Sequence, residues 1–155
     1  MTTSTKSHVQ RTTSDENVIR RFYTALSAEN AESAESALID SCASDWQSYG
    51  NDGRFRPGGP SAFLTVLRVM HASVPDLKWD IKEILAFENR YVVRSQASGT
   101  PVAAFLGATP TGKSFNVMAI DVHTIKGGRI VRTYHVEDWM SAIQQVRSGD
   151  TQGGH

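Results

Sequence analysis

The chain has little of what marks a secreted, membrane or nucleic-acid-binding protein. Its single cysteine, Cys42, cannot form an intramolecular disulfide, so we expect a reducing, cytoplasmic setting. Sixteen basic and sixteen acidic side chains cancel at pH 7, which argues against nucleic acid and acidic membranes as partners. No apolar run approaches the roughly 18 residues that cross a bilayer, and the polar N-terminus lacks the apolar core of a secretory signal.

Motifs for phosphate binding, metal binding and serine hydrolysis are also missing. The sequence contains no Walker loop, no GxGxxG after a strand, no GxSxG, no HExxH and no paired CxxC. The two glycines of the segment 107–113 lack Walker spacing and predict a loop between strands. We therefore expect no metal site and no bound cofactor.

The length of 155 residues suits one domain with a buried core. Residues 1–13 are polar and predict a disordered tail, residues 14–147 a single domain, and residues 148–155 a flexible tail. Ser14 is a favoured helix N-cap, and apolar residues at helical spacing predict a helix over 15–28. Two further helices are predicted over 31–41 and from Gly59-Pro60 to Pro75.

The second half changes to the period of strands. Alternating apolar residues predict strands over 77–87, 91–100, 115–126 and 129–137, followed by a short helix over 139–147. Helices followed by an antiparallel meander define an α+β fold. We expect a curved, mostly antiparallel sheet that packs on the helices and closes an apolar pocket.

Asp121 and His135 are the first candidates for chemistry. Asp121 interrupts the apolar face of the 115–126 strand, where a carboxylate needs a partner. A three-residue loop, Gly127 to Arg129, would place His135 directly opposite Asp121, whereas a two-residue loop would place Tyr134 there. The pair is either a general acid–base, with the carboxylate orienting the imidazole, or a buried structural pair, or two side chains that turn outward on an exposed face.

Three charged residues each allow two interpretations. Asp138 precedes the last predicted helix, so it is either an N-cap or a catalytic carboxylate. Glu83 is either a carboxylate inside the pocket or a residue that a β-bulge turns to solvent. Arg94 either balances Glu83 or lies on the surface.

Further side chains are candidates to line the pocket. Trp46, Tyr49 and Asn51 cluster after the second helix, in a segment predicted to be irregular, where they form either the rim of a pocket or a plug for the core. Phe63 follows the helical spacing of the third helix, and Tyr134 precedes His135. We count all five as candidate pocket residues.

The chain resembles the SnoaL-like polyketide cyclases, often called ester cyclases. Phe105-Leu-Gly-Ala-Thr-Pro-Thr-Gly-Lys113 is similar to their F-x-G-x-P-P-T-G-K loop. The similarity continues through Ile120-Asp121-Val122, Ile125-Lys-Gly-Gly-Arg-Ile-Val131 and Tyr134-His-Val-Glu-Asp-Trp139. It covers about residues 14–147.

This resemblance implies a nuclear transport factor 2-like cone with a deep pocket, a homodimer that packs through the sheet, and cofactor-free acid–base chemistry. In the founding cyclases an Asp on the last strand deprotonates a carbon acid for an intramolecular aldol closure, beside a His on the preceding strand. Alignment places His135 at that Asp and Asp121 at that His, so the pair is exchanged. Asp138 also matches an Asp common in the family. Ketosteroid-isomerase-like chemistry is less supported, because Phe22 stands where the tyrosine of the first helix would be.

The leading hypothesis is an enzyme that acts on a small apolar, carbonyl-bearing metabolite. His135 would be the general base, supported by Asp121, and Tyr134, Asp138 or Asn51 would donate a hydrogen bond to the enolate oxygen. The reaction would be a cyclisation, or a related isomerisation, dehydration or hydrolysis. The alternatives are a non-catalytic ligand-binding protein and a module that binds a protein through its sheet.

Overall fold

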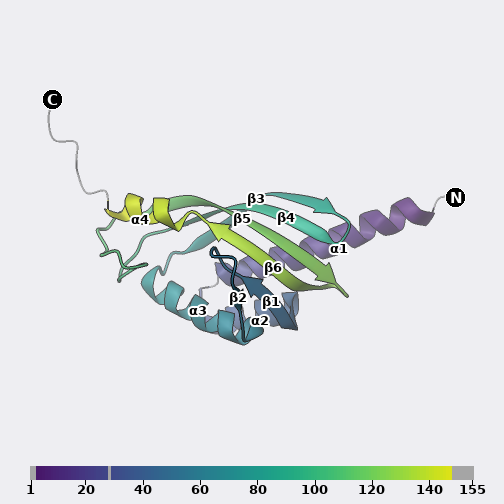
Figure 1. Ribbon diagram of the computed structural model, residues 1–155, viewed down its shortest axis with the longest axis horizontal. Coiled ribbons are helices and arrows are strands. Elements are labelled where there is room, and N and C mark those ends of the chain that lie inside the picture. Colours follow the sequence, from purple (N-terminus) through teal and green to yellow (C-terminus); the bar gives the residue numbers. More distant parts are fainter. Residues whose placement is uncertain (1–2, 28, 148–155) are drawn as a thin grey trace, which may run out of the picture.

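A computed structural model describes residues 3–27 and 29–147, and side chains from Thr13 onwards within these ranges. This part of the chain forms four helices and six strands (Figure 1). In chain order these are α1 (Thr3–Leu26), α2 (Ala31–Ser41), β1 (Cys42–Tyr49), β2 (Phe55–Arg56), α3 (Gly59–Ser73), β3 (Lys78–Phe87), β4 (Arg90–Gly99), β5 (Phe115–Lys126), β6 (Arg129–Glu137) and α4 (Trp139–Arg147).

The strands form one curved sheet in the order β2-β1-β6-β5-β4-β3. Neighbouring strands are antiparallel except β1 and β6, which run parallel. Helices α1, α2 and α3 lie along the same face of the sheet, and α4 lies at one end (Figure 1). The predicted α+β class and the mostly antiparallel sheet are confirmed.

The segment after α2 is a strand, so the prediction of irregular structure there is wrong. Strand β1 pairs with β6, and its register shifts between Cys42 and Gln47. This interruption breaks the alternation of buried residues that would have marked a strand in the sequence. The strand extends the sheet beyond the predicted meander and forms one wall of the site.

Helix α1 begins at Thr3, and the predicted start at Ser14 is therefore wrong. Residues 3–13 continue the helix instead of forming a disordered tail. The first glycine of the chain is Gly50 and the first proline is Pro57, so nothing in this segment breaks a helix. The first turns of α1 extend past the end of the sheet (Figure 1). The predicted tails over residues 1–2 and 148–155 lie outside the described residues.

The core fills the space between the helices and the inner face of the sheet. Alternate residues of β4 and β5 are buried, as the period of a strand requires. They pack against the apolar face of α1, which includes Ile19, Phe22 and Leu26. The buried face of β5 carries Phe115, Val117, Ala119, Asp121 and His123, as predicted.

The hairpin between β5 and β6 combines a short turn with a bulge. Gly127 and Gly128 have positive φ angles of 59° and 73°, which suits a two-residue type I′ turn. Lys126 lies opposite Arg129, but the register then shifts by one residue at Val131. The turn is therefore the shorter alternative, whereas the register is the one expected from the longer loop.

Among the described residues, no helix is both long enough and apolar enough to cross a membrane.

Candidate active site

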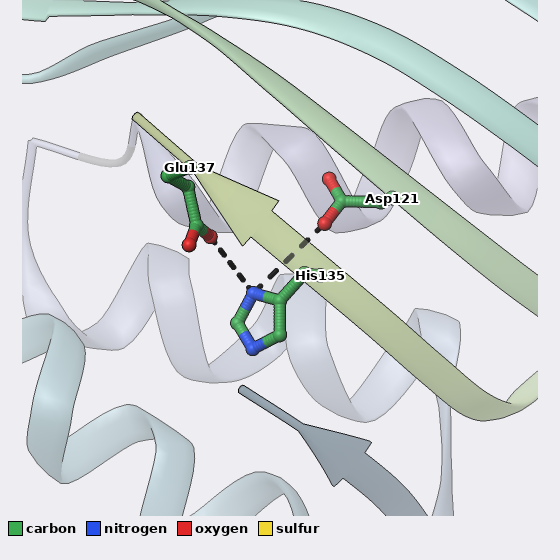
Figure 2. A group of neighbouring side chains, drawn as sticks. All are labelled: Asp121, His135 and Glu137. Atoms are coloured by element: carbon green, nitrogen blue, oxygen red, sulfur yellow. Dashed lines mark hydrogen bonds and ion pairs between the residues drawn. The ribbon is translucent and has the colours of Figure 1, made fainter. Parts of the chain in front are cut away.

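Asp121, His135 and Glu137 converge on the inner face of β5 and β6 (Figure 2). Asp121 lies opposite His135 in the antiparallel ladder. The Nδ1 atom of His135 is 2.8 Å from Oε1 of Glu137 and 3.9 Å from Oδ1 of Asp121. Because Glu137 follows His135 by two residues on the same strand, both side chains point to the same face. One imidazole is thus placed between two carboxylates.

The imidazole of His135 forms part of the wall of a cavity of about 400 Å³ between α3, β1, β6 and α4. A cavity of this size suits a small organic ligand. Asp121 is buried behind this wall and does not line the cavity. The lining residues are Ser48, Gly50, Asn51, Arg56, Pro57, Gly59, Ala62, Phe63, Val66, His135, Glu137 and Trp139.

The two nitrogen atoms of His135 have different surroundings. A carboxylate only accepts hydrogen bonds, so the short contact with Glu137 places the imidazole proton on Nδ1. The other nitrogen, Nε2, has Ser48 Oγ at 3.5 Å, a residue of the cavity wall. In the neutral imidazole, Nε2 therefore holds the lone pair that can accept a proton at the cavity.

The surroundings of Asp121 and His135 raise the pKa of both groups above their ordinary values. Burial raises the pKa of Asp121 to about 7, against the opposing effects of the charge of His135 and a hydrogen bond from Tyr23. Burial lowers the pKa of His135, but the hydrogen bond and charge of Glu137, with the charge of Asp121, outweigh it and leave that pKa above its ordinary value. The charge of each group therefore influences the protonation of the other, and both groups hold their protons to higher pH than usual.

Three residues of the site were not among the candidates from sequence, and two of them, Tyr23 and His123, are buried beside Asp121. The Tyr23 hydroxyl donates a hydrogen bond to Oδ2 of Asp121 and lies 3.1 Å from Nε2 of His123. The first helix thus supplies a tyrosine to the site after all, one residue beyond Phe22, whose ring packs in the core. The signal was present, because Tyr23 follows Ile19 by one helical turn.

Glu137 was also missed, although it shares the alternation of His135. Its side chain is 8% exposed, which is uncommon for a carboxylate and fits its hydrogen bond to the imidazole. Counting by two from His135 would have found it. In the sequence only Asp138 is marked by its position, directly before the predicted last helix.

Of the five predicted pocket residues, two line the cavity. Asn51 and Phe63 do so, while Trp46 is buried in the core, its ring against Phe63. Tyr49 and Tyr134 pair with each other, ring centroids 4.8 Å apart, and neither lines the cavity. The prediction is wrong for Tyr49 and Tyr134 because alternate residues of a strand point to opposite faces of the sheet. It is wrong for Trp46 because this side chain is buried in the core, where its indole N–H bonds to Thr133.

The charged candidates Glu83, Arg94 and Asp138 do not line the cavity. The register of β3 shifts between Ile81 and Glu83, and Glu83 forms a 2.8 Å ion pair with Arg94, both about half exposed. Neither lines the cavity, so the bulge and the ion pair are the correct alternatives. Asp138 caps α4, accepting hydrogen bonds from the amide and the hydroxyl of Ser141, which hold its pKa below the ordinary value.

Asp121, His135 and Glu137 could also supply ligands to a divalent cation, since one atom of each lies within 4.8 Å of the others. The 2.8 Å contact between His135 Nδ1 and Glu137, however, has the length of a hydrogen bond from an N–H group to a carboxylate. His135 Nδ1 donates to Glu137, and the raised pKa of the imidazole favours retention of its proton over a metal bond.

The fold and the site define a class of small α+β proteins that hold a ligand cavity between helices and a curved sheet. A model of the SnoaL-like polyketide cyclase family matches residues 17–146, and the chain belongs to this family. No curated protein gives a significant match.

Solved structures share the nuclear transport factor 2-like fold. A candidate SnoaL-like polyketide cyclase from Jannaschia sp. CCS1 superposes with a TM-score of 0.77 and 14% identity, covering 89% of this chain and 94% of that one. IdmH, a candidate polyketide cyclase from Streptomyces antibioticus, gives a TM-score of 0.73 and 22% identity, covering 84% of this chain and 96% of that one. A protein with a ketosteroid isomerase-like fold from Catenulispora acidiphila, in complex with trimethylamine, gives a TM-score of 0.67 and 15% identity, covering 83% of this chain and 91% of that one.

Proposed function

We propose that the protein is a cofactor-independent acid–base enzyme that acts on a small apolar metabolite with a carbonyl group. The reaction is an intramolecular aldol cyclisation, or a related isomerisation, dehydration or hydrolysis. The observation that carries this proposal is the position of His135, with Nδ1 held by Glu137 and Nε2 beside the cavity. The family supports the same class of reaction.

In the cyclisation, Nε2 of His135 removes a proton from the carbon next to the carbonyl. The electron pair of that C–H bond forms an enolate, and the positive charge that develops on the imidazole is stabilised by Glu137 and Asp121. The enolate carbon then attacks a second carbonyl of the same molecule. The proton held by His135 passes to the resulting alkoxide, so the enzyme returns to its starting state.

Hydrogen-bond donors for the enolate oxygen come from the cavity wall. Ser48 and Asn51 both line it, and the Asn51 amide is fixed by two 3.2 Å hydrogen bonds with the backbone of Glu137. An amide held in this way does not reorganise when the charge develops. Of the donors expected from sequence, Asn51 keeps this role, whereas Tyr134 and Asp138 do not line the cavity.

The proposal is tested by hydrogen–deuterium exchange at a carbon acid. The probe is 2-tetralone, an apolar bicyclic ketone, whose α-protons are followed by proton NMR in D₂O. The wild type should accelerate exchange, and His135→Ala should lose about 10²-fold or more of that acceleration. Tyr134→Phe, on the opposite face of the same strand, is the matched control and should retain it. Equal rates for wild type and His135→Ala would contradict the assignment.

The alternative function is a non-catalytic protein that binds a small molecule. The predominantly apolar wall, with Phe63, Val66 and Trp139, also suits this role. Saturable binding of 2-tetralone in a thermal-shift titration, without any acceleration of exchange, would favour it.

We also propose a homodimer that packs through the outer face of the sheet, as the family resemblance implies. Met118, Ile120, Tyr134 and Val136 are 40–59% exposed and lie on neighbouring strands. A cluster of exposed apolar side chains of this kind is typical of an association surface. Light scattering should give twice the chain mass for the wild type and a monomer for Ile120→Lys, whereas a wild-type monomer would refute the dimer.

We place the protein in the cytoplasm. The chain has one cysteine, Cys42, which is not in a disulfide, and a cysteine left unpaired is typical of proteins in reducing compartments. Microscopy of a fluorescent fusion in the producing cell tests this placement.

A further inference from the structure

A chain of buried hydrogen bonds leads through the core to Asp121. Trp46 Nε1 lies 2.9 Å from Thr133 Oγ1, which lies 2.9 Å from His123 Nδ1. His123 Nε2 is 3.1 Å from the Tyr23 hydroxyl, which bonds to Oδ2 of Asp121. None of these side chains lines the cavity, and the mechanism above uses only the last of them, Asp121.

The direction of every bond in this chain follows from the chemistry of its members. Burial first, and then the charge of Asp121, raise the pKa of Tyr23 well above its ordinary value, so the phenol stays protonated. Its O–H group donates a hydrogen bond to Asp121. Tyr23 can then only accept from His123. The imidazole must therefore carry its proton on Nε2.

The direction of the remaining hydrogen bonds also follows from the donors and acceptors that each group has. Burial lowers the pKa of His123 to about 3, so this imidazole is neutral and has a single N–H. With Nε2 protonated, Nδ1 is an acceptor and receives a hydrogen bond from the hydroxyl of Thr133. The oxygen of Thr133 accepts from Trp46, whose indole N–H is only a donor.

We propose that Thr133, His123 and Tyr23 form a hydrogen-bond relay of fixed direction that presents Asp121 to His135 as an oriented carboxylate, with Tyr23 as its positioning residue. The relay rests on the proposed role of the Asp121–His135 pair. It uses Oδ2 of Asp121 and leaves Oδ1 facing His135, so the two oxygens have separate partners.

Few other groups influence the two titrating side chains. Asp121 is faced by Tyr23 from α1 and by His135 and Glu137 from β6, and its ladder partner on β4 is the apolar Val93. His135 additionally experiences the positive charge of Arg56, which opposes its protonation. These charges stay in place when the Tyr23 hydroxyl is removed, so a change in titration reports on the relay.

The relay predicts how loss of that hydroxyl changes the titration of His135. Without the donor, Asp121 keeps its proton to higher pH, because the hydrogen bond from Tyr23 lowers its pKa. A protonated Asp121 offers less negative charge to the imidazole. The pKa of His135 should therefore fall in Tyr23→Phe.

Tyr91→Phe is the matched control, since it removes the same atom from another buried Tyr–Asp contact. The Tyr91 hydroxyl donates to Asp15 at 2.7 Å, and neither residue lines the cavity. The experiment follows the His135 imidazole by NMR from pH 5 to 9 in wild type and both variants. The midpoint should shift downwards in Tyr23→Phe and stay unchanged in Tyr91→Phe. Unchanged midpoints in both variants, or equal shifts in both, would overturn the relay.

The tautomer of His123 gives a second readout that needs no variant. Nitrogen-15 chemical shifts of the wild type at pH 8 should show the proton on Nε2. A proton on Nδ1 would overturn the proposed direction, even if Tyr23→Phe does not fold. Neither measurement involves turnover, so failure of the relay is distinguishable from failure of the proposed enzyme activity.

Discussion

Asp121 lies directly opposite His135 even though a two-residue turn joins their strands. A regular ladder closed by Gly127-Gly128 would pair Asp121 with Tyr134, whose side chain points to the outer face. The bulge at Val131 supplies the missing residue and brings the imidazole to the carboxylate. The local irregularity of β6 thus assembles the site.

The rate of proton abstraction should rise with pH through the pKa of His135. The base is the neutral imidazole, and Glu137 and Asp121 hold its pKa above the ordinary value, so the rise is displaced to higher pH than for an unperturbed histidine. A pH profile of 2-tetralone exchange measures it. Its midpoint should agree with the His135 midpoint from NMR, and a rate that falls as pH increases would contradict the assignment.

Glu137→Gln should lower the pKa of His135 and slow exchange. The substitution removes the charge and weakens the hydrogen bond that offset the burial of the imidazole. Asp138→Asn is the matched control, because this neighbouring carboxylate caps α4 outside the cavity. A His135 titration unchanged by Glu137→Gln would show that the 2.8 Å contact has no electrostatic role.

Asp138→Ala should destabilise the folded protein through loss of the helix cap and leave the exchange rate at saturating 2-tetralone unchanged. Urea unfolding and the exchange assay together check this expectation. A loss of activity in a folded Asp138→Ala variant would restore Asp138 as a catalytic candidate.

Asp121→Asn should make the free energy of unfolding less dependent on pH. The folded pKa of Asp121, about 7, is above its ordinary value of 3.8, so this group contributes stability below pH 3.8 that is lost as pH rises towards 7. The stability of the variant relative to wild type should therefore increase from pH 4 to pH 7. Urea unfolding at pH 4, 5.5 and 7 gives this difference, and a constant difference would mean that Asp121 titrates normally.

Zinc or magnesium should not accelerate the exchange of 2-tetralone protons. A cation between Asp121, His135 and Glu137 would displace the proton that His135 donates to Glu137. Exchange rates after dialysis against a chelator should equal those in added Zn²⁺ or Mg²⁺. Activity that disappears on chelation and returns with one metal would replace the cofactor-free mechanism.

Alternation along single strands predicted much of the fold and part of the site. It placed Asp121 on the buried face of β5, and the hairpin brought His135 near it. The same alternation places Glu137 on the face of His135, but no feature of the neighbouring sequence makes Glu137 a better candidate for the site than Asp138. The bulge at Val131 could not be predicted, because register depends on pairing as well as on turn length.

Contacts between segments distant in sequence were beyond local patterns. Tyr23 meets Asp121 across 98 positions, and only the packing of α1 on the sheet brings them together. The same limitation explains Trp46 and Tyr49. Without β1 in the predicted sheet, no pattern could decide which side chain would face the core and which would face outwards.

The bulge in β6 also bears on how this hairpin can be altered. Register here is the sum of turn length and bulge, so a loop of three residues with a regular β6 would produce the same facing pair. Deleting Val131 while keeping Gly127-Gly128 would do so as well. The hairpin can therefore reach the same alignment of His135 with Asp121 in more than one way, and its turn can be redesigned for twist or stability without moving the imidazole away from the carboxylate.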